Sequence, residues 1–166
     1  LKLVRDDDVE AAPCELCEIC GYGRLVMEGY HQRPDATEEA TWVDTHGRRW
    51  LRTGDIGRLD DEGFLHIVDR KKDMILSGSQ NIYPADIEAV MRDHPAVADV
   101  AVVGVPSERW GETPLALVVA AGVGDTPDTG SLVEWTNQRV GKQQRLAGAV
   151  FVTELPRNPN GKILQR

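Results

Sequence analysis

The sequence predicts an α+β fold in two parts. Residues 1–68 form the β-rich first part, because short apolar segments alternate there with polar turns. Residues 73–166 form a small domain, because two almost continuous apolar segments, 97–105 and 115–121, have the composition of buried strands and are accompanied by helix signals. In this domain we expect a three-stranded sheet with packed helices and a two-stranded hairpin.

The first part reads as strands over 1–4 and 17–26, separated by an acidic turn at 6–8. A loop with a helix start follows over residues 29–37. Trp42 and Trp50 flank a polar turn, and a second turn at 60–63 leads into a strand that ends at residue 68, as in a hairpin.

The segment Asp69-Arg70-Lys71-Lys72-Asp73 follows this strand. Three consecutive cations between two aspartates do not suit a buried strand, because an unpaired buried charge is costly. We therefore expect a solvent-exposed connection, which is either a polar hairpin turn or a joint that bends. The change of pattern places the domain boundary at residues 69–72.

After the boundary, residues 74–76 are apolar and end at Ser77-Gly78-Ser79. Pro84 suits the first turn of a helix, and acidic residues at 86 and 88 suit its positive end. Apolar residues at 87, 90 and 91 give this helix one buried face, and Pro95 ends it.

Ser131 with Glu134 has the pattern of a capping box that opens a second helix, and residues 149–152 read as a third strand. The last segment, 156–161, contains two prolines, two asparagines and a glycine. Asn160-Gly161 is a strong turn signal, so Lys162 lies just past a turn.

Composition limits the classes of function. A net charge of -8 and a pI of about 5.0 argue against a surface for nucleic acid or for anionic membranes. No segment has the length of a transmembrane span, and no signal peptide is evident. The first residue is Leu1 rather than methionine, so we expect a piece of a longer protein.

The cysteines are Cys14, Cys17 and Cys20. A strand places Cys17 on the face opposite to the other two, so buried thiols are favoured over metal ligands, although the spacing resembles part of a metal motif. We expect no metal site in the chain, and free thiols fit a cytoplasmic location.

Four polar features could carry chemistry. In Thr53-Gly54-Asp55, a turn presents a carboxylate that could accept hydrogen bonds from two vicinal hydroxyls. Arg70 could bind a carboxylate or phosphate, or lie in water. The Ser77–Ser79 segment allows close approach of a ligand or only turns the chain. Lys162 is either solvated or a cation that stabilises developing charge.

Taken together and in this order, these segments resemble the adenylate-forming superfamily, and within it the acyl-CoA synthetases. The resemblance rests on four separated motifs: Thr53-Gly54-Asp55-Ile56-Gly57, the stretch from Asp69 to Gly78, Asn81-Ile82-Tyr83-Pro84-Ala85-Asp86-Ile87-Glu88, and Pro156-Arg157-Asn158-Pro159-Asn160-Gly161-Lys162-Ile163. It covers essentially the whole chain.

The resemblance implies that residues 1–68 end a large N-terminal AMP-binding domain, that 69–72 form a hinge, and that 73–166 form the mobile C-terminal domain. It implies ATP, Mg²⁺ and CoA as substrates beside a fatty or aryl acid, and the missing N-terminal domain as the partner of this chain. The implied roles are nucleotide binding for Asp55 and Arg70, the hinge position for Lys72, and catalysis of adenylation for Lys162. CoA binding is implied for Ser77, Gly78, Ser79, Asn81 and Trp110.

One residue departs from the family pattern. Ser79 stands where family members usually have a second glycine. If the backbone needs positive φ there, serine costs on the order of 1–2 kcal/mol, which puts thioester formation in doubt more than adenylation. The phosphate loop, the adenine contacts and the acyl pocket lie outside this sequence, so we expect the 166 residues alone to be inactive.

Two alternatives remain at this point. One is an adenylation module that loads a carrier protein, although the segment Ile82-Tyr83-Pro84 looks more like CoA ligases. The other is a non-catalytic binding module that kept the fold, against which the presence of Asp55, Arg70 and Lys162 argues.

Overall fold

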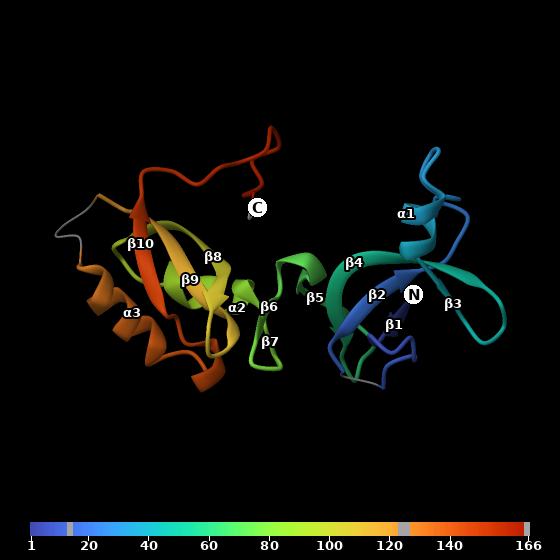
Figure 1. Cartoon of the computed structure of the whole chain (residues 1–166), viewed down its shortest axis with the longest axis horizontal. Helices are drawn as coiled ribbons and strands as arrows, with labels where there is room; N and C mark the ends of the chain where they lie inside the picture. The colour runs from blue at the N-terminus through green and yellow to red at the C-terminus, as the bar shows by residue number, and fades with distance from the viewer. Residues whose placement is uncertain (13–14, 123–126, 165–166) are drawn as a thin grey trace. The chain divides into compact units, whose positions relative to one another are not determined.

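The computed structural model describes residues 1–12, 15–122 and 127–164. The chain divides into two compact units, Leu1–Lys72 and Asp73–Arg166 (Figure 1). The division falls at the end of the predicted boundary segment. The assignment of the first unit to a larger AMP-binding domain stays a prediction.

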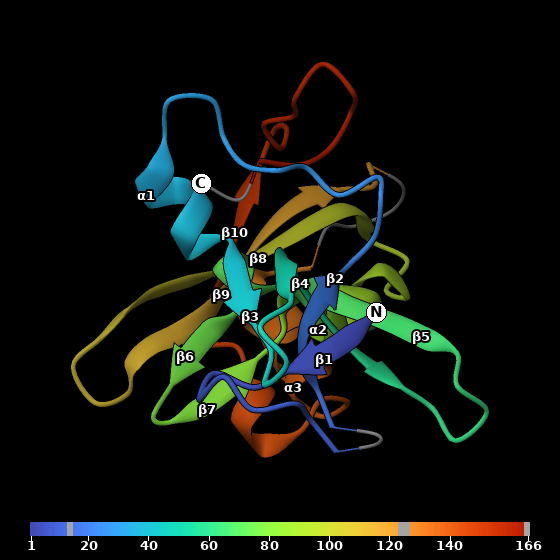
Figure 2. The ribbon, with the colours of Figure 1, turned by 90° about the vertical axis from the view of Figure 1, so that its right-hand side faces the viewer.

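The first unit is an antiparallel sheet of five strands (Figure 2). Strand β4 is its centre, because it pairs with β2 through residues 51–57, with β3 through residues 49–51 and with β5 through residues 55–59. β1 pairs with β2 at the edge. The elements are β1 (Lys2–Val4), β2 (Cys17–Gly21), α1 (Pro34–Glu39), β3 (Thr41–Val43), β4 (Arg49–Leu59) and β5 (Leu65–Arg70).

Both faces of this sheet carry apolar clusters. Cys20 packs with Val4 and the two tryptophans, whereas Cys17 packs with Leu3 and Ile19. The predicted opposite orientation of Cys17 and Cys20 is therefore confirmed, and Cys14 lies outside the described residues. Burial raises the pKa of Cys20 to about 11, with a smaller contribution from Glu18, so this thiol stays protonated.

Two sequence expectations in this unit were wrong in extent. The strand predicted over 17–26 ends at Gly21, where its pairing with Leu51 ends, and Leu25 is fully exposed. The boundary segment is also less of a turn than expected. Asp69 and Arg70 continue β5, because they pair with Ile56 and Asp55, and only Lys71–Asp73 form a short 3-10 helix.

The second unit is a mixed sheet with two helices (Figure 1). β9 is central, pairing antiparallel with β8 and parallel with β10. The hairpin of β6 and β7 joins β9 through Ser77 and Gly111. The elements are β6 (Ile75–Ser77), β7 (Gln80–Ile82), α2 (Pro84–Arg92), β8 (Val97–Ser107), β9 (Gly111–Ala120), α3 (Thr129–Asn137), a 3-10 turn Lys142–Gln144 and β10 (Gly148–Val152). The predicted α+β class is confirmed.

The helices bury apolar side chains against the sheet. Ile87 and Met91 of α2 and Leu132 of α3 have no exposed surface and join one core with residues of β8 and β9. Glu88 was expected to complement the helix dipole, but it is buried. Its carboxylate accepts hydrogen bonds from the Val102 amide at 2.9 Å and from Arg92 at 2.8 Å.

The predicted capping box at Ser131 was wrong in position. The N-cap of α3 is Asp128, whose carboxylate accepts a hydrogen bond from the Ser131 amide at 3.0 Å. Asp is as good an N-cap as Ser, so the helix begins three residues earlier than the Ser131 pattern suggests. In the part of the chain that the structure describes, no helix is long and apolar enough to cross a membrane.

Candidate functional site

Asp55 and Arg70 lie opposite each other on paired strands of the first unit. Their register in β4 and β5 brings the Arg70 Nε within 2.9 Å of Asp55 Oδ1. The turn expected at Thr53-Gly54-Asp55 was wrong, because all three residues lie within strand β4. Gly54 nevertheless has a φ of 73°, and the Asp55 amide donates to the Thr53 hydroxyl at 3.1 Å. Both charged side chains are partly exposed, so a carboxylate and a guanidinium are presented together to solvent.

Ser77, Gly78, Ser79 and Gln80 form the tight turn between β6 and β7. Ser77 pairs with Gln80, and the two residues between them have φ values of 52° and 70°. Positive φ at both central positions is the geometry of a type I′ hairpin turn. The Ser77–Ser79 segment, which was expected either to admit a ligand closely or only to turn the chain, therefore forms the tip of a hairpin.

Trp110 lies beside this tip, in the loop that joins β8 and β9. Its carbonyl accepts a hydrogen bond from the Gly78 amide at 2.7 Å. A Cβ atom at Gly78 would come within 2.7 Å of the Trp110 ring, so glycine is needed for the contact as well as for its positive φ. The ring is half exposed and the Arg109 guanidinium lies 4.6 Å from its centroid.

A pocket of about 360 Å³ opens next to these residues. Of the predicted CoA-binding residues, Ser77, Gly78 and Trp110 line it, whereas Ser79 and Asn81 do not. Its walls also include Gln80, Thr113, Pro114, Lys142, Gln143 and Arg145. The pocket thus combines an indole face, the backbone of a hairpin tip and two cations, which suits an anionic ligand with a flat ring.

Lys142 and Arg145 were missed by the sequence analysis. They belong to the short 3-10 turn after α3 and its end, where neither a helical nor a strand period marks them. The only available signal was two basic residues close together in an acidic chain.

Lys162 lies in a small hairpin at the end of the second unit. The Asn158 carbonyl accepts from the Gly161 amide at 2.9 Å, and the Asn158 side chain accepts from the Lys162 amide at 2.9 Å. Gly161 has a φ of 80°. An ion pair between Arg157 and Asp99 ties this hairpin to β8. The lysine is exposed, just past the turn.

The predicted site residues thus fall into separate groups. Asp55 and Arg70 form one group in the first unit, and the three pocket residues form another in the second unit. Lys162 lies in its own hairpin, and Lys72 is an exposed residue of the 3-10 helix at the unit boundary.

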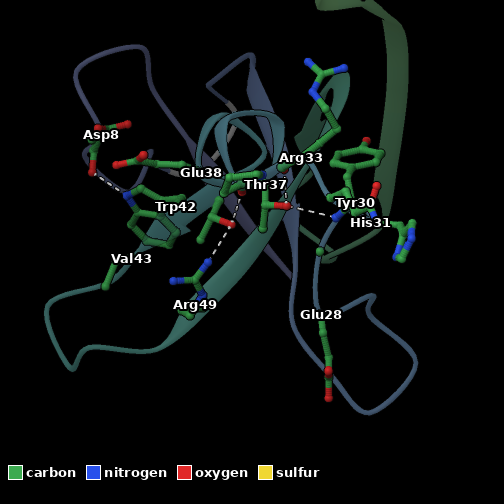
Figure 3. A pocket seen from close by; sticks show the side chains of 14 residues that line it. Asp8, Glu28, Tyr30, His31, Arg33, Thr37, Glu38, Trp42, Val43 and Arg49 are labelled. Atoms are coloured by element: carbon green, nitrogen blue, oxygen red, sulfur yellow. Dashed lines mark hydrogen bonds between the residues drawn. The ribbon is translucent and has the colours of Figure 1, made fainter.

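A larger hollow of about 1050 Å³ lies on the first unit, around α1 and β3 (Figure 3). The indole of Trp42 donates to the Asp8 carbonyl and the Tyr30 amide donates to Thr37 across its walls. None of the predicted site residues is among the residues that line it. Its size alone therefore does not connect it to the chemistry predicted above.

Comparisons with known proteins agree on one group. Residues 86–162 match the family model of the AMP-binding enzyme C-terminal domain. The chain is 44% identical over 160 residues to 2-succinylbenzoate–CoA ligase of Geobacillus kaustophilus, covering 96% of this chain and 31% of that protein. It is 43% identical over 143 residues to long-chain-fatty-acid–CoA ligase FadD13 of Mycobacterium tuberculosis, covering 85% of this chain and 27% of that protein.

Among solved structures, the chain resembles o-succinylbenzoate CoA synthetase (MenE) from Bacillus subtilis in complex with its acyl-adenylate intermediate. The TM-score is 0.83 at 38% identity, over 99% of this chain and 32% of that chain. The same synthetase has been solved with ATP and a magnesium ion. The chain spans about a third of the length of the relatives it matches.

Proposed function

We propose that this chain belongs to the adenylate-forming enzymes, whose C-terminal domain its residues 86–162 match, and that it is part of an acid–thiol ligase. The complete enzyme would join a carboxylic acid and ATP into an acyl-adenylate with release of pyrophosphate. CoA would then displace AMP and form the thioester. The names of the relatives support an aryl or a fatty acid as the substrate.

The observation that carries the proposal is the pocket beside Trp110. Three residues predicted to bind CoA from sequence meet there with Lys142 and Arg145, which sequence reasoning did not predict. CoA is a polyanion with an adenine ring, so cations and an exposed indole are suitable partners for it. The pantetheine arm would pass along the tip formed by Ser77 and Gly78.

For the first half-reaction we propose that Asp55 accepts hydrogen bonds from the ribose hydroxyls of ATP, with Arg70 beside it. Their ion pair supports this role, because it holds both groups in a fixed geometry before the nucleotide binds. The carboxylate of the acid substrate and the triphosphate of ATP repel each other. Lys162 and the Mg²⁺ that arrives with ATP would screen this repulsion and stabilise charge on the α-phosphate.

Lys72 would be the hinge residue between the two half-reactions. Its place at the boundary of the two compact units supports this role. The cytoplasmic location and the inactivity of the 166 residues alone stay predictions.

Two substitutions in the full-length enzyme test the proposal by opposite effects. Lys162→Ala should slow acyl-adenylate formation about 100-fold or more, because one cation at the reacting centre is lost, and should leave thioester formation from supplied acyl-adenylate nearly unchanged. Arg145→Ala should do the reverse: adenylation continues, and the KM for CoA rises about tenfold through loss of a charged contact. Pyrophosphate release and thioester formation are measured separately.

Lys2→Ala is the matched control, because it removes a cation that is remote in sequence from both Lys162 and Arg145. Adenylation that survives Lys162→Ala would show that this lysine has another role. Transfer of the acyl group to a carrier protein instead of CoA would favour a carrier-loading module. Absence of acyl-adenylate in the unmodified full-length protein would favour a non-catalytic binding module.

A further inference from the structure

A buried carboxylate connects three segments of the first unit. Glu18 of β2 is 5% exposed, and its Oε2 atom lies 2.8 Å from Arg52 Nη1 on β4 and 3.1 Å from Lys71 Nζ. Lys71 is the first residue after β5. One oxygen therefore joins β2, β4 and the end of β5.

Two outer carboxylates complete this network. Asp8 pairs with Arg52, and Asp6 pairs with Lys71 at 2.8 Å. Burial alone would lower the pKa of Lys71, but its hydrogen bonds to Asp6 and Glu18 raise the pKa above the ordinary value. Lys71 thus remains a cation, and the buried Glu18 carboxylate keeps two positive partners, without which its burial would be costly.

The network ends at the residue that precedes the proposed hinge. Arg70 is held on β4 by Asp55, and Lys71 is held on β2 by Glu18. Two consecutive residues before Lys72 are therefore each tied by an ion pair to the sheet of the first unit. The compact unit itself ends at Lys72.

We propose that Glu18 and Lys71 are positioning residues that fix the first-unit side of the hinge, so that bending begins at Lys72. The proposal rests on the proposed function, in which residues 69–72 connect two domains that change orientation. A hinge works through a few residues that absorb large φ and ψ changes while their neighbours stay in place. Without the Glu18–Lys71 pair, the motion would spread back into the end of β5.

Hydrogen exchange in the full-length enzyme tests the anchor directly. Lys71→Met keeps most of the side-chain length and removes its charge, and Glu18→Gln keeps the shape of the buried side chain. Each should make the amides of residues 65–71 exchange about tenfold faster, through local opening of the strand end. Lys71→Arg, which keeps the positive charge, should exchange these amides as slowly as the unmodified enzyme. Lys2→Met is the matched control: it removes the ion pair between Lys2 of β1 and Glu10, and should leave these amides unchanged.

The double substitution shows whether the two residues act through each other. If they form one anchor, Glu18→Gln with Lys71→Met should accelerate exchange no more than either change alone. If the double variant instead increased the exchange rate by the product of the two single increases, the two residues would act independently and the pairing would be overturned. Exchange within about twofold of the unmodified enzyme in both single variants would overturn the anchor itself.

Kinetics test the consequence for catalysis. Lys71→Met should slow the complete reaction about threefold or more, and should slow single-turnover adenylation less, because only the complete reaction requires the change of orientation. If Lys71→Met slowed the complete reaction and single-turnover adenylation equally, Lys71 would contribute only to the stability of the enzyme. An unmodified enzyme that forms no acyl-adenylate would contradict the proposed function, whereas the exchange measurement would still decide on the anchor.

Discussion

At the scale of single residues, Ser79 shows a conflict between residue type and backbone conformation. Its φ of 70° is one that side chains other than glycine adopt at a cost of about 1–2 kcal/mol. The turn requires this conformation, because Gly78 and Ser79 together form the two-residue connection between β6 and β7. From the sequence, strain at Ser79 was expected only if the backbone had positive φ there, and it does.

We expect Ser79→Gly to raise the free energy of unfolding by about 0.5–1 kcal/mol, because relief of the left-handed strain exceeds the added entropy of the unfolded glycine. Urea unfolding of the 166-residue chain measures this. Ser77→Gly is the matched control. Ser77 is a strand residue without positive φ, so glycine there should lower the free energy of unfolding by about the same amount. A loss of stability in Ser79→Gly would show that the serine side chain contributes a contact worth more than the strain.

At the scale of elements, the hairpin of β3 and β4 depends on one buried carboxylate in its turn. Asp44 accepts hydrogen bonds from the amides of His46 and Arg48 and from the Arg48 guanidinium, each at 2.9 Å, and from the Trp50 indole at 3.0 Å. Burial alone would raise the pKa of Asp44, but these four donors hold it far below its ordinary value.

A carboxylate with a lowered pKa stabilises the folded state fully above its unfolded pKa of about 3.9, and this contribution is lost as the pH falls toward the folded value. We therefore expect Asp44→Asn to be clearly less stable than the unmodified chain at pH 7. The melting temperatures of the two proteins should converge as the pH is lowered from about 5 to 2.

Thermal unfolding followed over this pH range checks the expectation. Asp35→Asn is the control, because the Asp35 side chain is 66% exposed and its pair with Arg33 contributes little to stability. A constant difference in melting temperature between Asp44→Asn and the unmodified chain at every pH would contradict the titration of Asp44.

Elements with strong local signals could be predicted from the sequence, and those set by partners could not. Pro84 at the start of α2 and the apolar segments of β8 and β9 carry their own signals. The end of β2 is set by where its pairing with β4 stops, and Arg70 belongs to a strand because Asp55 lies opposite it. Likewise, Lys142 becomes a pocket residue only through the fold.

At the scale of the whole molecule, each compact unit carries its own core. The core of the second unit includes residues of β6 to β9, both helices and Leu146, which all lie after residue 73. The clusters of the first unit lie before residue 72 and are smaller. Apolar burial is the main favourable contribution to folding, and the second unit contains its own apolar core.

We therefore expect residues 73–166, produced without the first unit, to unfold cooperatively in urea and to give a circular dichroism spectrum with both helix and strand contributions. Residues 1–72 are the comparison, since their two small clusters should make them less stable when produced alone. An unfolded 73–166 would mean that the core of this unit forms only in the presence of the first. A cooperative transition would show that the pocket beside Trp110 belongs to a unit that folds on its own, which the proposed rotation about Lys72 between two half-reactions requires.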